Sequence, residues 1–590
     1  MNKLLLTFDN PWTKAELLKE TAYETLDRQF HSGLAESLGG LSPVSLALAL
    51  ADWAWHLSLS PGRQMHLAGM AYKLAEQSCS PGTALAPHLG PLDEDPRFRH
   101  EAWAQWPFCQ LRAAFKNQEN FWEEAVHMPG MTAHHTQMVH FFSKQFLGFL
   151  TPANWLPTNP VVLQDVVQSQ GAHLAQGFRH WLEDLYGQHA QGANAEAKFV
   201  AGKQVACTPG KVVFRNHLIE LLRYDAQTPQ VHPEPVLIIP SWIMKYYILD
   251  LSPHNSMVQY LVSLGHTVYM LSWRNPQASD HDLTMDDYLR MGIFDALGEI
   301  GLLSGTKHGV HAVGYCLGGT LLAIAAAALA REHGVSRTTH LPPLQTITLL
   351  AAQTDFSEPG ELGLFIDESQ IEYLDNITRG KGYLTGEQMA GSFQFLHSRD
   401  LIWTRRMREY LMGEREQTTD LMAWNADITR IPARMHHEYL NSLYLNNQLA
   451  ASAYEVEGHS VSLGDIRTPL FLVATQRDHI SPWTSVYKLH HLCDSEITFV
   501  LTSGGHNAGI VSEPGHAKRS YQISTRPAHG TWIEPDHWPQ HATSHTGSWW
   551  PAWQHWLAER SSPPEDAKKF ETVQDFGDAP GTYIFQRYKN

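Results

Sequence analysis

A cysteine framed by glycines is the residue of this chain with the clearest capacity for covalent chemistry. Cys316 lies in the hexapeptide GYCLGG (residues 314–319), after a strand-like run at 308–313 and before an alanine-rich, helix-like run at 321–332. Glycines on both sides of a central residue permit the strained turn of a nucleophile elbow, which pushes that side chain out above a sheet. The pattern therefore predicts that Cys316 is a nucleophile.

Two polar residues farther along the chain complete a set suited to nucleophilic catalysis. Asp478 follows a predicted strand at 469–475, and His506 lies in a glycine-flanked loop after a predicted strand at 497–502. A histidine can take the proton of a nucleophile while a carboxylate orients the imidazole. One such residue alone is more often a solvated turn residue. Three in the order nucleophile, acid, histidine, each following a predicted strand, favour a catalytic triad of the kind found in α/β-hydrolases.

Two backbone amides near Cys316 are candidates for stabilising an oxyanion. The tetrahedral intermediate of an acyl transfer needs preorganised N–H donors. One predicted donor is the amide of Leu317, directly after the nucleophile. The other is the amide of Ile243, chosen by its position in the loop after a predicted strand at 235–239.

The character of the chain changes near residue 195. Before it, hydrophobic spacing predicts helices, and no segment carries a catalytic signature. After it, predicted strands alternate with helical stretches, which implies a largely parallel sheet with helices on both faces. The strand rhythm stops at about 356–444, where a helical insertion is typical of a cap over the active site. The predicted fold class is α/β: an α/β-hydrolase domain at 196–590 with this helical cap insertion, preceded by a mostly α-helical N-terminal domain at 1–195.

The predicted elements follow from these patterns of apolar residues. In the N-terminal part the predicted helices span 16–30, 44–57, 65–77 and 163–186. In the rest of the chain the predicted strands span 211–215, 235–239, 266–273, 308–315, 346–351, 469–475 and 497–502.

Composition excludes several classes of protein. With 43 Lys and Arg against 60 Asp and Glu, the net charge is −17, which argues against a nucleic-acid-binding surface. The five cysteines are widely spaced without a C-x-x-C pair, which favours a reducing cytoplasm over a disulfide framework. The longest apolar stretch, 43–55, is too short for a transmembrane segment, and residues 1–9 lack the features of a targeting signal. The paired histidines are adjacent rather than four residues apart, so no metal site is expected.

Taken together, the motifs resemble those of the polyhydroxyalkanoate (poly-3-hydroxybutyrate) synthases, most closely their class I members. The resemblance covers nearly the whole chain and depends on GYCLGG at 314–319, KYYILD at 245–250, SWRNP at 272–276, DHI with PW at 478–483 and GSWWP at 547–551. The segment TPANWLPTNP at 151–160 resembles the helical domain of the family, with Trp and Pro where Phe and Ala are common. Residues 39–62, within a segment 1–80, are similar to an extra N-terminal module of some members.

The resemblance implies a polymerase that joins (R)-3-hydroxyacyl-CoA units, 3-hydroxybutyryl-CoA foremost, into polyhydroxyalkanoate and releases CoA. In that family the residues matching Cys316, His506 and Asp478 are nucleophile, base and third triad member. CoA is part of the substrate and a product, so no cofactor is expected. The resemblance also implies a homodimer in the cytoplasm, associated with polyhydroxyalkanoate granules. Its further partners would be the growing polyester chain and granule-associated proteins.

The chemistry of a thiol suits this reaction. Attack of Cys316 on an acyl-CoA thioester yields another thioester, so the acyl group stays activated, and His506 can generate the thiolate. Asp478 can orient the imidazole, act directly on the incoming hydroxyl, or do both. The basic residues nearest the motifs, as candidates for the CoA phosphates, are Lys245, Arg274, Arg477, His479 and Lys488.

Two other functions stay open. The first is a thioesterase or esterase of the same fold, in which water replaces the hydroxyl as the attacking group and free hydroxy acid is the product. The second is a non-catalytic protein that coats granules. An intact set of Cys316, Asp478 and His506 argues against the second, because a coat protein needs no triad.

Overall fold

The computed structural model divides into two compact units, one helical and one built on a large sheet. The helical unit comprises Leu38–Asn194 and Ala390–Thr418, and the sheet unit comprises Met1–Ser37, Ala195–Met389 and Thr419–Asn590. The described residues are 41–79, 95–186, 198–304, 308–331, 341–386, 388, 403–415, 417–567 and 574–587, with isolated positions between 23 and 33. Most of the predicted helix at 16–30 lies outside them.

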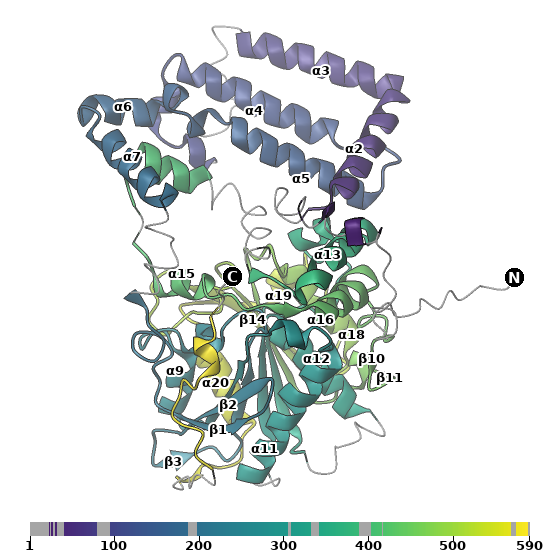
Figure 1. The fold of residues 1–590 in the computed structure, drawn as a ribbon, viewed down its shortest axis with the longest axis vertical. Coiled ribbons are helices and arrows are strands. Elements are labelled where there is room, and N and C mark those ends of the chain that lie inside the picture. Colours follow the sequence, from purple (N-terminus) through teal and green to yellow (C-terminus); the bar gives the residue numbers. More distant parts are fainter. Residues whose placement is uncertain are drawn as a thin grey trace, which may run out of the picture. The chain divides into compact units, whose positions relative to one another are not determined.

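In the helical unit, the described segments 41–79 and 95–186 contain six α-helices (Figure 1). Its two small apolar clusters centre on Trp103 with Phe115 and on Val126 with Met138. The segment 403–415 belongs to this unit, since the Arg415 guanidinium lies 2.7 Å from the Asp184 carboxylate. The helices are α2 (Pro43–Ser58), α3 (Pro61–Cys79), α4 (Phe108–Ala125), α5 (Ala133–Leu150), α6 (Pro160–Gln168) and α7 (Ala172–Leu185).

The single helix predicted at 163–186 is wrong, because the chain turns in its middle. Helix α6 ends at Gln168 and α7 begins at Ala172. Between them Gln170 and Gly171 have φ values of 54° and 81°, which a right-handed helix does not accommodate. A glycine at the break makes this turn inexpensive.

The sheet unit is built around a ten-stranded sheet with the order β1-β2-β5-β4-β6-β7-β12-β13-β14-β15 (Figure 1). Neighbours from β5 through β13 pair in parallel, while the two strands at each edge pair antiparallel. The parallel strands therefore end together at one edge of the sheet. The bounds are β1 (Lys211–Arg215), β2 (Ile219–Tyr224), β4 (Val236–Ile239), β5 (Val268–Trp273), β6 (Val310–Tyr315), β7 (Leu344–Leu350), β12 (Leu470–Thr475), β13 (Ile497–Thr502), β14 (Ser520–Arg526) and β15 (Thr543–Thr546).

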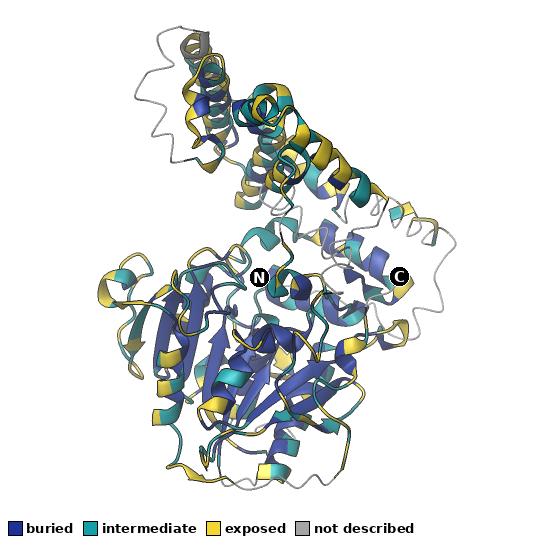
Figure 2. Ribbon diagram, turned by 90° about the vertical axis from the view of Figure 1, so that its left-hand side faces the viewer, coloured by how far each residue is buried: buried dark blue, intermediate teal, exposed yellow. Residues whose placement is uncertain are grey.

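All seven predicted strands are present, and the sheet also contains strands that the prediction lacked. The parallel strands are buried on both faces, so they read as continuous apolar runs that are easy to recognise (Figure 2). The missed strands β14 and β15 lie at one edge and carry mostly polar residues. Strand β2 follows β1 after a short turn, and it includes Glu220 and Arg223 among its apolar residues; the prediction did not include it.

Helices on the two faces of the sheet enclose the main core. They include α9 (Met257–Ser263), α11 (Asp295–Ser304), α12 (Leu317–Ala330) and α20 (Trp550–Glu559). Helix α12 is almost entirely buried, as its run of alanines allows. The tryptophans of the C-terminal GSWWP region pack on the sheet as their helical spacing predicts, and the Trp553 indole donates a 3.0 Å hydrogen bond to Thr348.

The predicted cap region is mostly helical in its described parts. It contains α13 (Glu368–Lys381), α15 (Asp420–Asn425), α16 (Ala433–Glu438) and the π-helical turn η14 (Tyr439–Leu445), with the short strands β8 (Tyr383–Leu384) and β9 (Ile431–Pro432) paired to each other. Its residues 403–415 group with the helical unit instead. Across the described chain, the helices are all too short or too polar to cross a bilayer.

Candidate active site

Cys316 lies in the turn between β6 and α12. Its φ of 53° and ψ of −124° place a non-glycine residue in a strained conformation, which is the signature of a nucleophile elbow. Hydrogen bonds hold this strain in place. The Cys316 amide donates to the Leu350 carbonyl at 2.9 Å, and the Cys316 carbonyl accepts the Gly319 amide at 2.9 Å.

The glycines of GYCLGG are required by close packing around the elbow. A Cβ on Gly318 would lie 2.3 Å from the Ile239 carbonyl oxygen, and one on Gly319 would lie 2.4 Å from Ala352 Cβ. Both distances are far below any real Cβ contact. The first turn of α12 can therefore lie directly against the end of β4, which brings the loop after β4 close to Cys316.

Asp478 and His506 come together at the carboxyl ends of β12 and β13. The Nδ1 atom of His506 lies 2.8 Å from Oδ2 of Asp478, and both side chains are almost completely buried. The other oxygen of Asp478 accepts the backbone amides of Ile480 and Ser481 at 3.0 and 2.8 Å. These bonds fix the carboxylate, so it can orient the imidazole.

The charge state of His506 reflects its two neighbours. Burial alone would lower the pKa of His506, but the Asp478 carboxylate and Cys316 together raise it well above 6.5. A hydrogen bond with the Cys316 side chain is among the causes. The pKa of His506 thus responds to both Asp478 and Cys316, which places the three predicted triad residues near one another.

Asn507 and Tyr315 link the loop of His506 to the elbow, and the sequence prediction lacked this link. The Tyr315 hydroxyl donates a 2.6 Å hydrogen bond to the Asn507 side chain. The Tyr315 ring centroid lies 5.8 Å from that of His506. Each of the two residues is adjacent to a predicted triad member in the sequence, and this position could have identified them.

The loop that carries the predicted donor Ile243 is held by the cap region. The Ile243 carbonyl accepts the Thr429 amide at 3.0 Å, and the Trp242 carbonyl accepts the Thr429 hydroxyl at 2.8 Å. The Trp424 indole donates to the Lys245 carbonyl at 2.7 Å. The predicted donor Leu317 is the first residue of α12, where backbone amides are free of intrahelical partners.

Two tyrosines of the cap approach the nucleophile. Tyr439 and Tyr444 are buried on η14, and their hydroxyl oxygens lie 3.3 Å apart. Burial raises the pKa of both phenols, and the nearby Cys316 raises it further. The sequence prediction placed a cap over the site but did not identify these residues, because they are ordinary apolar-helix positions in the sequence.

The candidate phosphate-binding residues have different surroundings. Lys488 pairs with Glu358 at 2.6 Å, Arg274 pairs with Asp280, and His479 lies 4.0 Å from Glu361. Lys245 is buried, which lowers its pKa to about 8. Arg477 is exposed and directly precedes Asp478 in the chain.

Among the described residues, Cys, His, Asp and Glu side chains form no group of three or more that could hold a metal ion. The cysteines 109, 207, 316 and 493 are free thiols.

Comparison with protein-family models finds three matches along the chain. The model described as "Poly-beta-hydroxybutyrate polymerase (PhaC) N-terminus" matches residues 94–261, and "Poly-beta-hydroxybutyrate polymerase N terminal" matches residues 21–63. The model "alpha/beta hydrolase fold" matches residues 234–513, which confirms the predicted fold class. A solved monoacylglycerol lipase of Paleococcus ferrophilus aligns with 58% of this chain and 99% of its own at 12% identity, with a TM-score of 0.31.

Curated relatives match over most of the chain. A "Poly(3-hydroxyalkanoate) polymerase" of Methylorubrum extorquens is 37% identical over 85% of this chain and 82% of its own. A "Poly(3-hydroxyalkanoate) polymerase subunit PhaC" of Cupriavidus necator is 35% identical over 86% of this chain and 85% of its own. The family resemblance seen in the motifs is thereby confirmed, and the chain belongs to the poly(3-hydroxyalkanoate) polymerase family.

Proposed function

We propose that this protein is an acyltransferase that polymerises (R)-3-hydroxyacyl-CoA, with 3-hydroxybutyryl-CoA foremost, into polyhydroxyalkanoate and releases CoA. The printed names of its relatives describe such polymerases. The observation that carries the proposal is the buried Asp478–His506 pair, 2.8 Å between Oδ2 and Nδ1, beside a cysteine in an elbow conformation.

In the first half-reaction Cys316 becomes acylated. His506 takes the thiol proton, and the thiolate attacks the carbonyl carbon of the acyl-CoA thioester. The oxyanion is stabilised by the amides of Leu317 and Ile243 in this proposal. When the intermediate collapses, the bond to the CoA sulfur breaks and His506 returns its proton to that sulfur, so CoA leaves as a thiol.

In the second half-reaction the chain grows by one ester. The free hydroxyl of another hydroxyacyl unit loses its proton to His506 or Asp478, and its oxygen attacks the acyl-Cys316 carbonyl. Collapse breaks the bond to the cysteine sulfur, which regains a proton. A thioester is exchanged for an ester, and this exchange drives elongation. Asp478 accepts two backbone amides as well as the imidazole, which favours its role in orienting His506 over direct proton transfer.

Water competes with the hydroxyl, so the site must be dry. The buried Tyr439–Tyr444 pair and the almost completely buried His506 support such a site. If water reached the acyl-enzyme instead, the protein would be the thioesterase named above as the alternative.

Assembly and location are further parts of the proposal. By family resemblance we propose a homodimer in the cytoplasm, attached to polyhydroxyalkanoate granules, where the growing polyester and granule-associated proteins are its partners. Light scattering coupled to gel filtration measures the mass of the assembly. Fractionation of polymer-producing cells tests the attachment, and a protein found only outside the granule fraction would contradict it.

The decisive experiment analyses both products of one reaction. The purified protein is incubated with (R)-3-hydroxybutyryl-CoA, CoA release is followed in quenched samples with a thiol reagent, and the acyl product is sized. CoA release with a high-mass polyester supports the polymerase. Release with free 3-hydroxybutyrate selects the thioesterase. The Cys316→Ala variant is the control for background hydrolysis.

A further inference from the structure

Lys245 is a buried amine that the proposed mechanism does not use. Its residue surface is 3% exposed. The Nζ atom donates hydrogen bonds to the carbonyl of Tyr583 at 3.0 Å and to that of Gln586 at 2.9 Å. Burying an amine is costly unless its N–H donors are satisfied, and these two hydrogen bonds offset that cost for Lys245.

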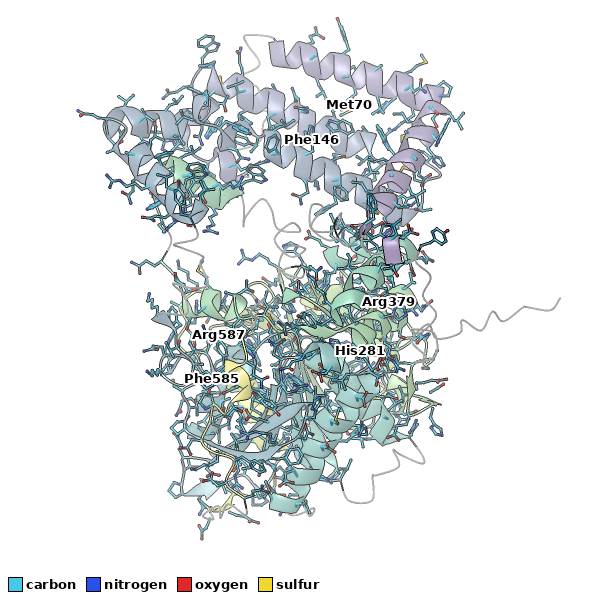
Figure 3. The ribbon with its side chains drawn as sticks, in the orientation of Figure 1. Met70, Phe146, His281, Arg379, Phe585 and Arg587 are labelled. Atoms are coloured by element: carbon cyan, nitrogen blue, oxygen red, sulfur yellow. The ribbon has the colours of Figure 1, made fainter. Side chains whose placement is uncertain are left out.

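The segment that receives Lys245 lies at the C-terminal end of the described chain. Figure 3 labels Phe585 and Arg587 of this segment. It is anchored on the sheet by the buried carboxylate of Glu220 in β2, which accepts the amides of Thr582 and Tyr583 at 2.8 and 2.9 Å. The Asn275 side chain adds a 3.4 Å hydrogen bond to the Gln586 carbonyl. This segment is therefore a fixed point to which a loop can be tied.

Lys245 is also the end of the loop that carries Ile243. The opposite side of this loop is held by Trp424 and Thr429, through their bonds to the carbonyls of Lys245 and Ile243. The loop thus lies between the cap region on one side and the C-terminal segment on the other. If the amine were lost, the loop would lose its tie to the C-terminal segment, while the hydrogen bonds from Trp424 and Thr429 would remain.

We propose that Lys245 is a positioning residue: it ties the oxyanion-donor loop to the C-terminal segment 582–586, so that the end of the chain sets the position of the Ile243 amide. This inference rests on the proposed function, because it assigns Ile243 a role in acyl transfer. It also explains why Lys245, although close to the site, does not serve as a phosphate contact: its donors are directed at backbone carbonyls.

The test compares two reactions of the same thiol. Acylation of Cys316 by 3-hydroxybutyryl-CoA needs an oxyanion hole, whereas alkylation by iodoacetamide is a direct displacement without an oxyanion. In Lys245→Met we expect the single-turnover acylation rate to fall by at least about tenfold, since small misplacements of a catalytic group are this costly. The alkylation rate and the KM for the CoA substrate should stay within about twofold of the wild type.

A matched control uses another lysine that contacts the same C-terminal region. Lys211 pairs with Asp578 on the surface. In Lys211→Met both rates should stay within about twofold of the wild type, because an exposed ion pair contributes little to the position of the chain. A Lys245→Met variant that acylates at the wild-type rate would overturn the inference. A parallel fall of acylation and alkylation would also overturn it, since that result means general damage to the site.

A second variant keeps the test decisive if Lys245→Met does not fold. Asn275→Ala removes the side-chain bond to the Gln586 carbonyl and the 3.0 Å bond that the Arg430 amide donates to Asn275 Oδ1, and it leaves the amine in place. We expect a smaller fall in acylation, about threefold, with alkylation unchanged. An unchanged acylation rate in Asn275→Ala would then count against the inference. If the wild type releases only free acid, polymerisation is refuted while this comparison still holds, because acylation precedes both fates.

Discussion

The two units of this protein bury their apolar residues to very different extents. In the sheet unit a large cluster of buried side chains includes Trp549, Trp550 and Trp553. In the helical unit the described residues form small clusters and leave large apolar side chains exposed, including Trp55, Tyr72 and Phe146, the last of which is labelled in Figure 3.

This difference in burial indicates that the two units have different roles. The sheet unit contains the whole candidate triad, and its dense core can hold a strained elbow and a buried ion pair in place. Exposed apolar groups, in contrast, mark surfaces that bind something. We therefore expect substitutions in the sheet unit to change chemistry or folding, and most substitutions on the helical surface to leave both nearly unchanged.

The largest expected effect is the loss of the nucleophile. Cys316→Ala should lower CoA release by at least about a thousandfold, because no other group can form the acyl-enzyme. The fold should persist, since a smaller side chain at the elbow removes only a sulfur. CoA release and circular dichroism measure the two quantities. Substantial turnover by this variant would refute the assignment of Cys316.

A pair of tryptophan substitutions tests the difference in burial directly. Trp553 is 0% exposed and Trp55 is 68% exposed. Trp553→Ala should reduce the free energy of unfolding by about 3–5 kcal/mol, because it leaves a cavity in the main core. Trp55→Ala should change it by about 0.5 kcal/mol or less. Denaturant unfolding of both variants measures the free energy of unfolding. Equal losses would contradict the difference in burial between the two tryptophans.

A glycine in the helical unit gives a smaller, local effect. A Cβ on Gly177 in α7 would lie 2.0 Å from the carbonyl oxygen of Tyr410, within the same unit. Gly177→Ala should therefore destabilise the packing of α7 against 403–415 by about 1–3 kcal/mol.

The matched control for this substitution is Gly148→Ala in α5, where a new Cβ meets nothing within 4 Å. It should be neutral or stabilising by up to about 1 kcal/mol, because alanine favours a helix. Unfolding of this unit can be followed by limited proteolysis, while alkylation of Cys316 by iodoacetamide should be unaffected in both variants. If Gly148→Ala lowered the stability of this unit more than Gly177→Ala, the close packing at Gly177 would be contradicted.

The smallest expected effect concerns pH. The pKa of His506 is raised above its ordinary 6.5, so the charged pair with Asp478 stabilises the fold fully below about pH 6.5. This contribution is lost as the pH rises through the folded-state pKa. The difference in Tm between the wild type and Asp478→Asn should accordingly be larger at pH 6 than at pH 10 by about one degree, which corresponds to about 1 kcal/mol of pairing energy in a unit of this size. If the Tm difference grew with increasing pH, the predicted direction of the pH dependence would be wrong.

Local pattern was sufficient for much of the sheet unit. The parallel strands are apolar runs of the usual length, and GYCLGG with its flanking runs at 308–313 and 321–332 predicted a strand, a turn and a helix. The break between α6 and α7 was missed because residues 163–186 show helical spacing, and β14 because polar edge strands lack the apolar signal. These errors occur where local propensity and tertiary context disagree.

The family, the order of the candidate triad and the α/β-hydrolase architecture could be predicted from the amino-acid sequence, because each depends on short motifs and on the spacing of apolar residues along the chain. The surroundings of these residues became visible in the folded chain. The hydrogen bond from Lys245 to Tyr583 joins positions 338 residues apart, and Cys316 influences the pKa of Tyr439 although the two residues are distant in the sequence. Contacts of this kind depend on how distant segments pack, and no local pattern encodes that packing.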